Sequence, residues 1–341
     1  MLTKKVPLYF LIITFVITVV MSILGFCIVN SNSDIHERNN AISKSNDNNT
    51  KYNLTIKRLN GFQFIHPLLF AEPQTESAQL NGCKNVINNI INKHKSIGDI
   101  SSASVYIREF KQANWISING NESYSPGSLL KVPELIAFYK MNEKQPGFFD
   151  KEIEYKNKVS TDNRVIAFES NHIQVGKKYT IMELLNYMIV YSDNEATMLL
   201  NSLVDRAVFS NVFTDIGLKQ PDFTSPDYKI TASDFSLFLK ELYNGSYLNF
   251  ANSEACLSLL SKSVFRNGML KDLPINCKVA HKFGEGGQST APNFSEAAIV
   301  YAGENPYILT VMIKGYDMKL LPSVTAEISK NVYDFMLNKH F

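Results

Sequence analysis

Three short segments of the chain combine residue types that could carry out acyl transfer through a serine. The first is Ser128-Leu-Leu-Lys131, in which a lysine follows a serine by three residues. If Ser128 opens a helix, Lys131 lies one turn along the same face, where its amine could remove the hydroxyl proton. Because a serine at a helix start is usually an N-cap, this pair alone favours a structural role.

The second segment, Tyr191-Ser-Asp-Asn194, lies between two stretches of helical periodicity. Its Ser192 could pass on a proton, but Ser192 followed by Glu195 three residues later also fits a capping box. The third segment, His281-Lys-Phe-Gly284, falls in a predicted strand. A lysine on a strand is ordinarily a solvated edge residue, so Lys282 alone would not indicate a site.

The order and spacing of the three segments make them stronger evidence for a functional site than any one segment alone. Ser192 follows Ser128 by 64 residues (192 − 128), and Lys282 follows 90 residues later (282 − 192). The set S-x-x-K, S-D-N and K-T-G, in this order, is that of class A β-lactamases. The chain resembles the penicillin-recognising serine hydrolases, most closely these enzymes, from about Cys83 to the C-terminus. The similar stretches are Ser128-Leu-Leu-Lys-Val-Pro-Glu-Leu-Ile-Ala137, Tyr191-Ser-Asp-Asn-Glu-Ala-Thr197 and Ile230-Thr-Ala-Ser-Asp-Phe235.

The resemblance implies catalytic roles for three side chains. Ser128 would be the acylated nucleophile, Lys131 its base, and Ser192 the hydroxyl that relays a proton to the leaving amine. A free lysine has a pKa near 10.4, so keeping its amine neutral at pH 7 costs about 4.6 kcal/mol. Burial and the nearby cation Lys282 would both disfavour the charged form of Lys131, as a general base requires.

The resemblance also implies how a substrate would be bound. Asn194 would contact a substrate amide, and Lys282 would bring positive charge to the substrate carboxylate beside Gly284. The backbone N–H groups of Ser128 and Glu285 would form the oxyanion hole, whose donors are each worth about 3 to 4 kcal/mol. The expected chemistry needs no cofactor.

Two departures from the family pattern bear on the activity. Class A enzymes use a loop glutamate to activate the deacylating water, but the chain has no Glu between Asp205 and Tyr228. Asp222 or Asp227 could replace it, or Ser128 could acylate and release slowly. In the third segment, Phe283 stands where the family has a hydroxyl residue. We expect it to remove a hydrogen bond donor from the carboxylate site and to add bulk there.

The elements that must position these residues follow from periodicity. Two strands are expected at Ser104–Phe110 and Trp115–Ile118, after a helix that includes Cys83 and Ile91. Strands at both ends with helices between them, and the resemblance, predict an α+β fold in which the two ends form one antiparallel sheet against a helical subdomain. Helices are predicted at Leu129–Met141, Ile181–Val190, Ala196–Val204, Ser233–Leu242, Glu254–Leu260 and Ser323–Leu337, and further strands at Lys278–Phe283, Glu296–Tyr301 and Tyr307–Ile313.

Composition removes several classes of function. The 341 residues include 34 basic and 32 acidic ones, and a net charge of +2 gives no electrostatic reason to expect nucleic acid as a partner. The 4 Cys contain no C-x-x-C pair and the 6 His no H-E-x-x-H motif, so no metal site or disulfide framework is suggested. Outside the N-terminal apolar run, which contains Cys27, the cysteines are Cys83, Cys256 and Cys277. Because their number is odd, at least one is free or pairs between chains, and a Cys256–Cys277 pair is possible.

The N-terminus predicts a membrane protein. Val6–Val29 are 24 uncharged residues behind Lys4 and Lys5, and about 36 Å of helix exceeds a hydrocarbon core of about 30 Å. We interpret this run as an uncleaved transmembrane anchor with residues 1–5 in the cytoplasm, because lysines mark the cytoplasmic side. Residues 30–60, rich in Asn and Ser at their start, read as a linker. Residues 61–341 would form the extracytoplasmic hydrolase domain.

Three hypotheses about function remain open. The first is a membrane-anchored β-lactamase-type serine hydrolase that is acylated at Ser128 by β-lactams or D-alanyl-type amides. The second is a penicillin-binding, DD-peptidase-like enzyme that acts on peptidoglycan-type substrates and is acylated by β-lactams but deacylates slowly. The third is a non-catalytic cell-wall binding module, which the missing loop glutamate and Phe283 would suggest. Retention of all five side chains that would contact substrate or transfer protons speaks against the third.

Overall fold

The chain is described by a computed structural model for residues 53–158, 171–222 and 227–338. The predicted cytoplasmic tail at 1–5, the predicted anchor at 6–29 and most of the predicted linker lie outside these ranges. Within the described ranges, no helix is both long and apolar enough to cross a membrane.

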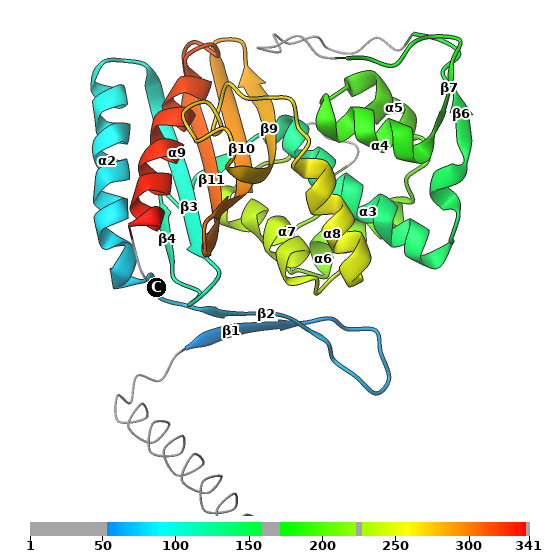
Figure 1. Ribbon diagram of the computed structural model, residues 1–341, viewed down its shortest axis with the longest axis horizontal. Coiled ribbons are helices and arrows are strands. Elements are labelled where there is room, and N and C mark those ends of the chain that lie inside the picture. The colour runs from blue at the N-terminus through cyan, green and yellow to red at the C-terminus, as the bar shows by residue number, and fades with distance from the viewer. Residues whose placement is uncertain (1–52, 159–170, 223–226, 339–341) are drawn as a thin grey trace, which may run out of the picture. The chain divides into compact units, whose positions relative to one another are not determined.

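A five-stranded antiparallel sheet forms one half of the fold (Figure 1). Val105 in β3 pairs with Ile118 in β4 on one side and with Val311 in β11 on the other. Strands from both ends of the domain therefore form one sheet, as the sequence predicted. Its strands, in spatial order, are β4 (Trp115–Ile118), β3 (Ile100–Glu109), β11 (Asn305–Gly315), β10 (Ala291–Ala302) and β9 (Lys278–Gln288).

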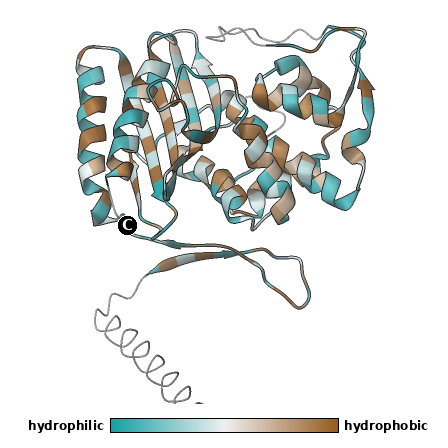
Figure 2. Cartoon of the chain, in the orientation of Figure 1, coloured by the Kyte–Doolittle hydropathy of each residue, from teal (hydrophilic) through white to brown (hydrophobic). Residues whose placement is uncertain are grey.

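Two apolar clusters cover the two faces of this sheet. Leu309 and Val311 face a cluster with helices α2 (Asn81–Ser96) and α9 (Leu321–Leu337). Ile308 and Met312, the alternate residues of β11, face the helical subdomain. Helix α2 shows bands of both hydrophobic and hydrophilic residues (Figure 2). Because side chains alternate across a strand, the same alternation decides which residues of β9 face the helices.

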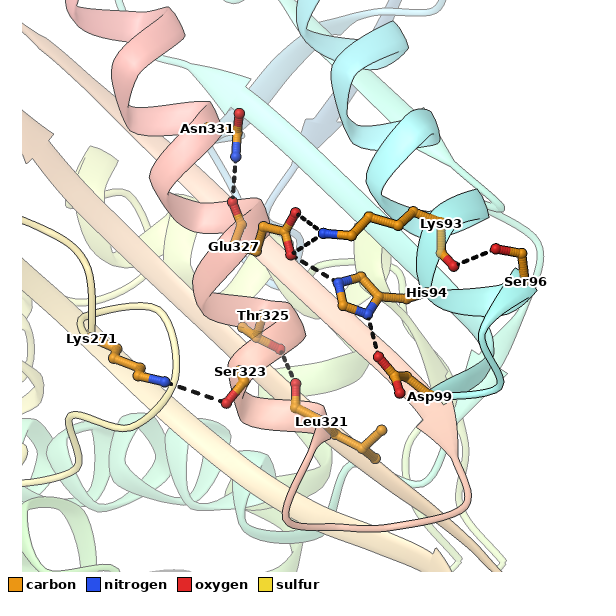
Figure 3. Close-up of polar contacts among 10 residues, drawn as sticks. All are labelled: Lys93, His94, Ser96, Asp99, Lys271, Leu321, Ser323, Thr325, Glu327 and Asn331. Atoms are coloured by element: carbon orange, nitrogen blue, oxygen red, sulfur yellow. Dashed lines mark hydrogen bonds and ion pairs between the residues drawn. The ribbon is translucent and has the colours of Figure 1, made fainter.

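A polar cluster joins α2 to α9 at the outer layer. The His94 ring lies between two carboxylates, with Nδ1 2.6 Å from Asp99 Oδ2 and Nε2 2.8 Å from Glu327 Oε2 (Figure 3). Lys93 donates to the same Glu327 carboxylate. The hydrogen bond from His94 lowers the pKa of Glu327, against a smaller opposing effect of burial.

The helical subdomain follows the predicted helices closely. The helix predicted at Ile181–Val190 has those bounds in α4, where Thr180 and Glu183 form a capping box. One helix, α6, was not predicted. The other helices are α3 (Lys131–Lys144), α5 (Asn194–Asn201), α6 (Arg206–Thr214), α7 (Ala232–Asn244) and α8 (Phe250–Leu260). The described chain also contains two short strand pairs, β5 (Ser123–Tyr124) with β8 (Ile230–Thr231) and β6 (Glu152–Glu154) with β7 (Lys178–Thr180). It has three 3-10 turns, η1 (Ala78–Leu80), η2 (Gly127–Leu130) and η3 (Phe148–Asp150).

A hairpin of β1 (Leu54–Arg58) and β2 (Leu68–Pro73) precedes the sheet. The prediction of a linker up to residue 60 was therefore wrong at its C-terminal end, because folded structure begins at Leu54. Glu72 fixes the hairpin, accepting hydrogen bonds from Arg108 in β3 and, at 2.8 Å, from Lys240 in α7. Burial raises the pKa of Glu72, but the charges of Lys240 and Arg108 outweigh it and keep this pKa below its usual value.

The three cysteines of the described ranges are all free. Cys83 and Cys256 are buried in the apolar clusters of the two faces, and Cys277 is partly exposed. The possible Cys256–Cys277 disulfide is not formed.

Candidate active site

Ser128 lies in the 3-10 turn η2, which runs directly into α3. The turn has no side-chain cap hydrogen bond, so the interpretation of Ser128 as an N-cap is wrong. Gly127 has φ +52°, a conformation that glycine adopts readily. A Cβ at Gly127 would lie 2.0 Å from the carbonyl oxygen of Glu285, so the turn also needs a glycine in order to approach β9.

The edge strand β9 passes directly against this turn. A Cβ at Gly284 would lie 2.3 Å from the carbonyl oxygen of Pro126 and 3.0 Å from the amide nitrogen of Ser128. Asn293 in β10 ties the same turn to the sheet by donating to the Ser125 carbonyl at 2.9 Å. The backbone of Ser128 and the backbone at Gly284–Glu285 are thus in contact, as the two halves of an oxyanion hole must be.

Ser192 connects the two lysines of the site. Its Oγ lies 2.9 Å from Lys282 Nζ and 3.3 Å from Lys131 Nζ. Ser192 has φ +55°, in the left-handed region that few serines adopt. This serine forms no capping box, because Asp193 is the N-cap of α5 and accepts from the Glu195 amide at 2.8 Å. The capping prediction was therefore wrong by one residue.

Lys131 is buried at the first position of α3 and faces three oxygen atoms. Its Nζ lies 2.7 Å from the Ser192 carbonyl oxygen and 2.8 Å from Asn194 Oδ1, in addition to the Ser192 hydroxyl. Burial lowers the pKa of Lys131 to about 7, although the carboxylates of Glu134 and Asp193 act in the opposite direction. At neutral pH a large share of the amine is therefore unprotonated, as a base requires.

The expected direct contact between nucleophile and base is not present. Among the described residues, Ser128 Oγ makes no hydrogen bond to Lys131, whose Nζ instead contacts Ser192 and Asn194. Catalytic hydrogen bonds commonly tighten only when substrate binds. Lys131 follows Ser128 by three residues, and its amine contacts the Ser192 hydroxyl.

Lys282 is fully buried, so the interpretation of a solvated edge lysine is wrong. Its strand position opposite Ala297 turns it toward the helical subdomain, and its Nζ donates to the Phe283 carbonyl at 2.9 Å as well as to Ser192. Burial and the nearby charge of Lys131 lower the pKa of Lys282 well below its usual value, against Glu296 and Glu285. Two ammonium groups in one buried site repel, so the pair releases a proton more readily than an isolated lysine.

The ring of Phe283 does not add bulk on the substrate side, contrary to our expectation. It belongs to the apolar cluster on the opposite face and stacks on Phe265 with ring centroids 4.0 Å apart. The ring also lies 4.2 Å from Lys282 Nζ, so it contacts the ammonium. His281 shares the face of Phe283 and is buried, with Nδ1 2.7 Å from Glu296 Oε1.

The two candidate replacements for the loop glutamate lie along another cavity. Asp222 and Asp227 line a cavity of about 420 Å³ together with Tyr228. Neither Ser128 nor Lys131 is among its lining residues. That either aspartate activates a deacylating water stays a prediction.

Sequence reasoning missed one residue of the site, Glu134. It lies one helical turn after Lys131 in α3, is 5% exposed, and acts electrostatically on Lys131. The signal was available, because Glu134 is an isolated carboxyl in the apolar stretch Val132–Phe138.

Comparisons with known proteins agree with this fold. A model of the beta-lactamase enzyme family matches residues 83–336. No curated protein matches the chain. Among solved structures, a beta-lactamase from Chitinophaga pinensis is 18% identical with a TM-score of 0.63, over 74% of this chain and 99% of that chain.

Two structures of PBP-A are also similar to the chain. One is 18% identical with a TM-score of 0.61, over 76% of this chain and 97% of that chain. The other is an acyl-enzyme complex of a PBP-A mutant with penicillin G, 19% identical with a TM-score of 0.59, over 74% and 96% of the two chains. At these identities the similarity establishes the shared α+β fold.

Proposed function

The chain belongs to the beta-lactamase enzyme family, and on that premise we propose that it forms an acyl-enzyme at Ser128 with β-lactams or D-alanyl-type amides. The observation that supports this most is the Ser192 hydroxyl, within hydrogen bonding distance of both Lys131 and Lys282. A hydroxyl between two buried amines is a path for a proton, and burial of two amines is too costly to be explained as packing.

Acylation then follows from the proton affinities of these groups. The neutral amine of Lys131 takes the Ser128 Oγ proton, and Oγ bonds to the substrate carbonyl carbon. The N–H groups of Ser128 and Glu285 donate to the developing oxyanion. Ser192 passes a proton from the Lys131 ammonium to the leaving nitrogen as the C–N bond breaks. The products are an ester on Ser128, a neutral leaving amine and a regenerated Lys131 amine.

A second version of this function differs only in the release step. The absence of Glu between Asp205 and Tyr228 favours an enzyme that acylates and releases slowly, as a penicillin-binding DD-peptidase would with a β-lactam. The family assignment covers both versions. A chromogenic cephalosporin separates them, because a β-lactamase gives steady turnover and a slowly deacylating enzyme gives a burst of one equivalent.

Intact-mass spectrometry after incubation with penicillin tests the proposal itself. We expect the chain to gain the mass of one penicillin during turnover or stably, and Ser128→Ala to gain none. Ser125→Ala, three residues before Ser128, is the matched control and should still be acylated. If the unaltered chain neither gains this mass nor hydrolyses the cephalosporin, the protein is a binding module and the proposal is wrong.

We also propose that residues 6–29 anchor the protein in the membrane with the hydrolase domain outside. The support is the uncharged run behind Lys4 and Lys5. With folded structure starting at Leu54, a coil of residues 30–53 would span about 27 Å r.m.s.. Protease added to intact cells should remove the domain, and a domain protected until the cells are lysed would contradict this topology.

A further inference from the structure

Glu134 is a buried acid with no part in the three sequence motifs. It lies in the first turn of α3, three residues after Lys131, and its side chain is 5% exposed. Its neighbours along the chain, Pro133 and Leu135, are apolar. A carboxyl group in such a place needs a physical reason, because glutamate is almost never fully buried unless it is paired.

Glu134 lacks the partners that an ionised carboxylate requires. Within the described ranges no hydrogen bond or ion pair reaches it, and its Oε1 atom is buried without a partner. Taking an ionised carboxylate out of water without donors costs several kcal/mol, whereas a protonated carboxyl largely avoids this cost. Burial raises the pKa of Glu134 to about 8, with Lys131 opposing the shift.

The contacts of Lys131 suit a neutral amine. An unprotonated amine has two N–H donors and one lone pair. Its two short contacts, 2.7 Å to the Ser192 carbonyl and 2.8 Å to Asn194 Oδ1, are to atoms that can only accept. The longer contact of 3.3 Å is to the Ser192 hydroxyl, which can donate to the lone pair.

We propose that Glu134 is a positioning residue that holds the proton of the Lys131–Glu134 pair, so that the amine is free to act as the base. The step is a proton transfer within the pair: an ammonium and a carboxylate become an amine and a carboxylic acid, with no net change in charge. The inference rests on the proposed acylation at Ser128, in which Lys131 is the base.

Two other charged groups, on two further elements, affect the charge balance around Lys131. Asp193, before α5, favours the ammonium form of Lys131. The pKa of Lys282, in β9, is lowered by Lys131, so the two lysines disfavour a double positive charge. Lys131 is the charged group that acts on Glu134. The proton can therefore lie on Lys131 or on Glu134, and burial of both groups favours the arrangement in which both are uncharged.

The variant Glu134→Gln tests the proposal because an amide resembles a protonated carboxyl in shape and charge. We expect the acylation rate at pH 7 to stay within about 3-fold and its acidic limb to move by less than half a pH unit. If Glu134 were an ionised partner of Lys131, removing its charge would lower the lysine pKa by about one unit or more. A shift of the acidic limb by a full unit to lower pH would thus overturn the proposal.

Infrared spectroscopy gives a test that does not depend on any substrate. At pH 7 a carbonyl stretch of protonated carboxylic acids should be present, and Glu134→Gln should remove part of it. Glu241 is the matched control, because burial also raises its pKa, in this case to about 7. It lies near the C-terminal end of α7. Glu241→Gln should remove its own share of the band and leave the acylation profile unchanged.

The two measurements separate two failures. A chain that is never acylated by penicillin contradicts the proposed function, even if the infrared band is present. A chain that is acylated but shows no protonated carboxyl signal from Glu134 contradicts the inference alone. If Glu134→Gln does not fold, the pH titration of the infrared band, read against Glu241→Gln, decides the inference by itself.

Discussion

The backbone conformation of Ser192 brings two of its oxygen atoms to the same lysine. Its left-handed φ allows the carbonyl oxygen and the hydroxyl of one residue to contact the same amine of Lys131. Such a conformation costs a non-glycine residue about 1 to 3 kcal/mol and is common at functional sites. The strain is consistent with a proton relay that needs both atoms in place.

The acylation rate should depend on pH through Lys131. Because its pKa is about 7, the unprotonated fraction falls roughly tenfold for each pH unit well below 7 and levels off above 8. The second-order rate constant for acylation by penicillin should follow this curve between pH 5.5 and 8.5. Circular dichroism over the same range controls for unfolding. A flat profile would mean that Lys131 is not the base.

Asn194→Asp should move this profile to higher pH. The new carboxylate would lie where Asn194 Oδ1 is now, 2.8 Å from Lys131 Nζ. An opposite charge at this distance typically raises a lysine pKa by about 1 to 3 units, so acylation at pH 7 should fall tenfold or more. The loss should be partly recovered above pH 8.

The exposed Asn201, at the other end of α5, provides the control for added charge. Asn201→Asp should leave the profile of the acylation rate where it is. An Asn194→Asp profile with the unaltered midpoint would show that Asn194 does not contact the amine during acylation.

The proximity of the motif residues could be predicted better than their surroundings. Lys131, Ser192 and Lys282 are in contact, and they could be selected because the motifs combine residue type with spacing. Phe283 was misinterpreted, although side chains alternate along a strand and Phe283, next to Lys282, must therefore lie on the opposite face of β9. Motif comparison describes positions, whereas the direction of a side chain follows from the strand.

At the scale of elements, the contact between η2 and β9 is the most demanding packing in the site. Gly284→Ala would place a Cβ 2.3 Å from the Pro126 carbonyl, so the strand and the turn must separate. Loss of one oxyanion donor typically costs about 10²- to 10³-fold in rate. We expect at least a 100-fold slower acylation, measured by intact mass against time.

Gly303→Ala is a suitable control for this substitution. Gly303 has φ +56° in the turn between β10 and β11, and a Cβ there would meet no atom within 4 Å. It should cost about 1 to 2 kcal/mol of stability through the backbone alone and leave acylation unchanged. If Gly284→Ala behaves like Gly303→Ala, the close approach does not matter for catalysis.

Elements with strong periodicity were predicted well, and those with weak signals were not. The α4 helix has a clear apolar face and a capping box, and its predicted bounds are confirmed. The β1 strand was missed because its alternation, Leu54-Thr-Ile-Lys-Arg58, continues an Asn-rich stretch and its outer face is exposed. A strand whose stability comes from a partner cannot be recognised from its own composition.

At the scale of the whole molecule, Glu72 links the N-terminal hairpin to both halves of the domain. Glu72→Ala would leave Lys240 and Arg108 buried without their carboxylate. Breaking a buried charge pair from one side typically costs about 3 kcal/mol or more. We expect a loss of this size in the free energy of unfolding measured with urea.

Glu76→Ala tests whether any glutamate in this region would have the same effect. Glu76 pairs with Lys84, and both of these side chains are more exposed than those of Glu72 and Lys240. Exposed pairs of this kind are worth about 1 kcal/mol or less. The buried position should therefore be clearly more costly than the exposed one. Equal losses would show that Glu72 does not carry the attachment of the hairpin.

The fold class was predictable because its two ends and its middle have different periodicities. The strands predicted at both ends, with helices between them, were enough to predict that the two ends form one antiparallel sheet. The bonding of particular groups across that fold, such as Glu72 with Lys240, joins residues 168 positions apart and has no local signal.

The pairing of β3 with β11 has a consequence for biosynthesis. Val105 and Val311 are neighbours in the sheet but 206 residues apart in the chain (311 − 105). At a translation rate of about 5 to 20 residues per second, the first of these strands waits about 10 to 40 s for its partner. Until then the nascent polypeptide cannot complete its central sheet, and β3 stays without its native partner.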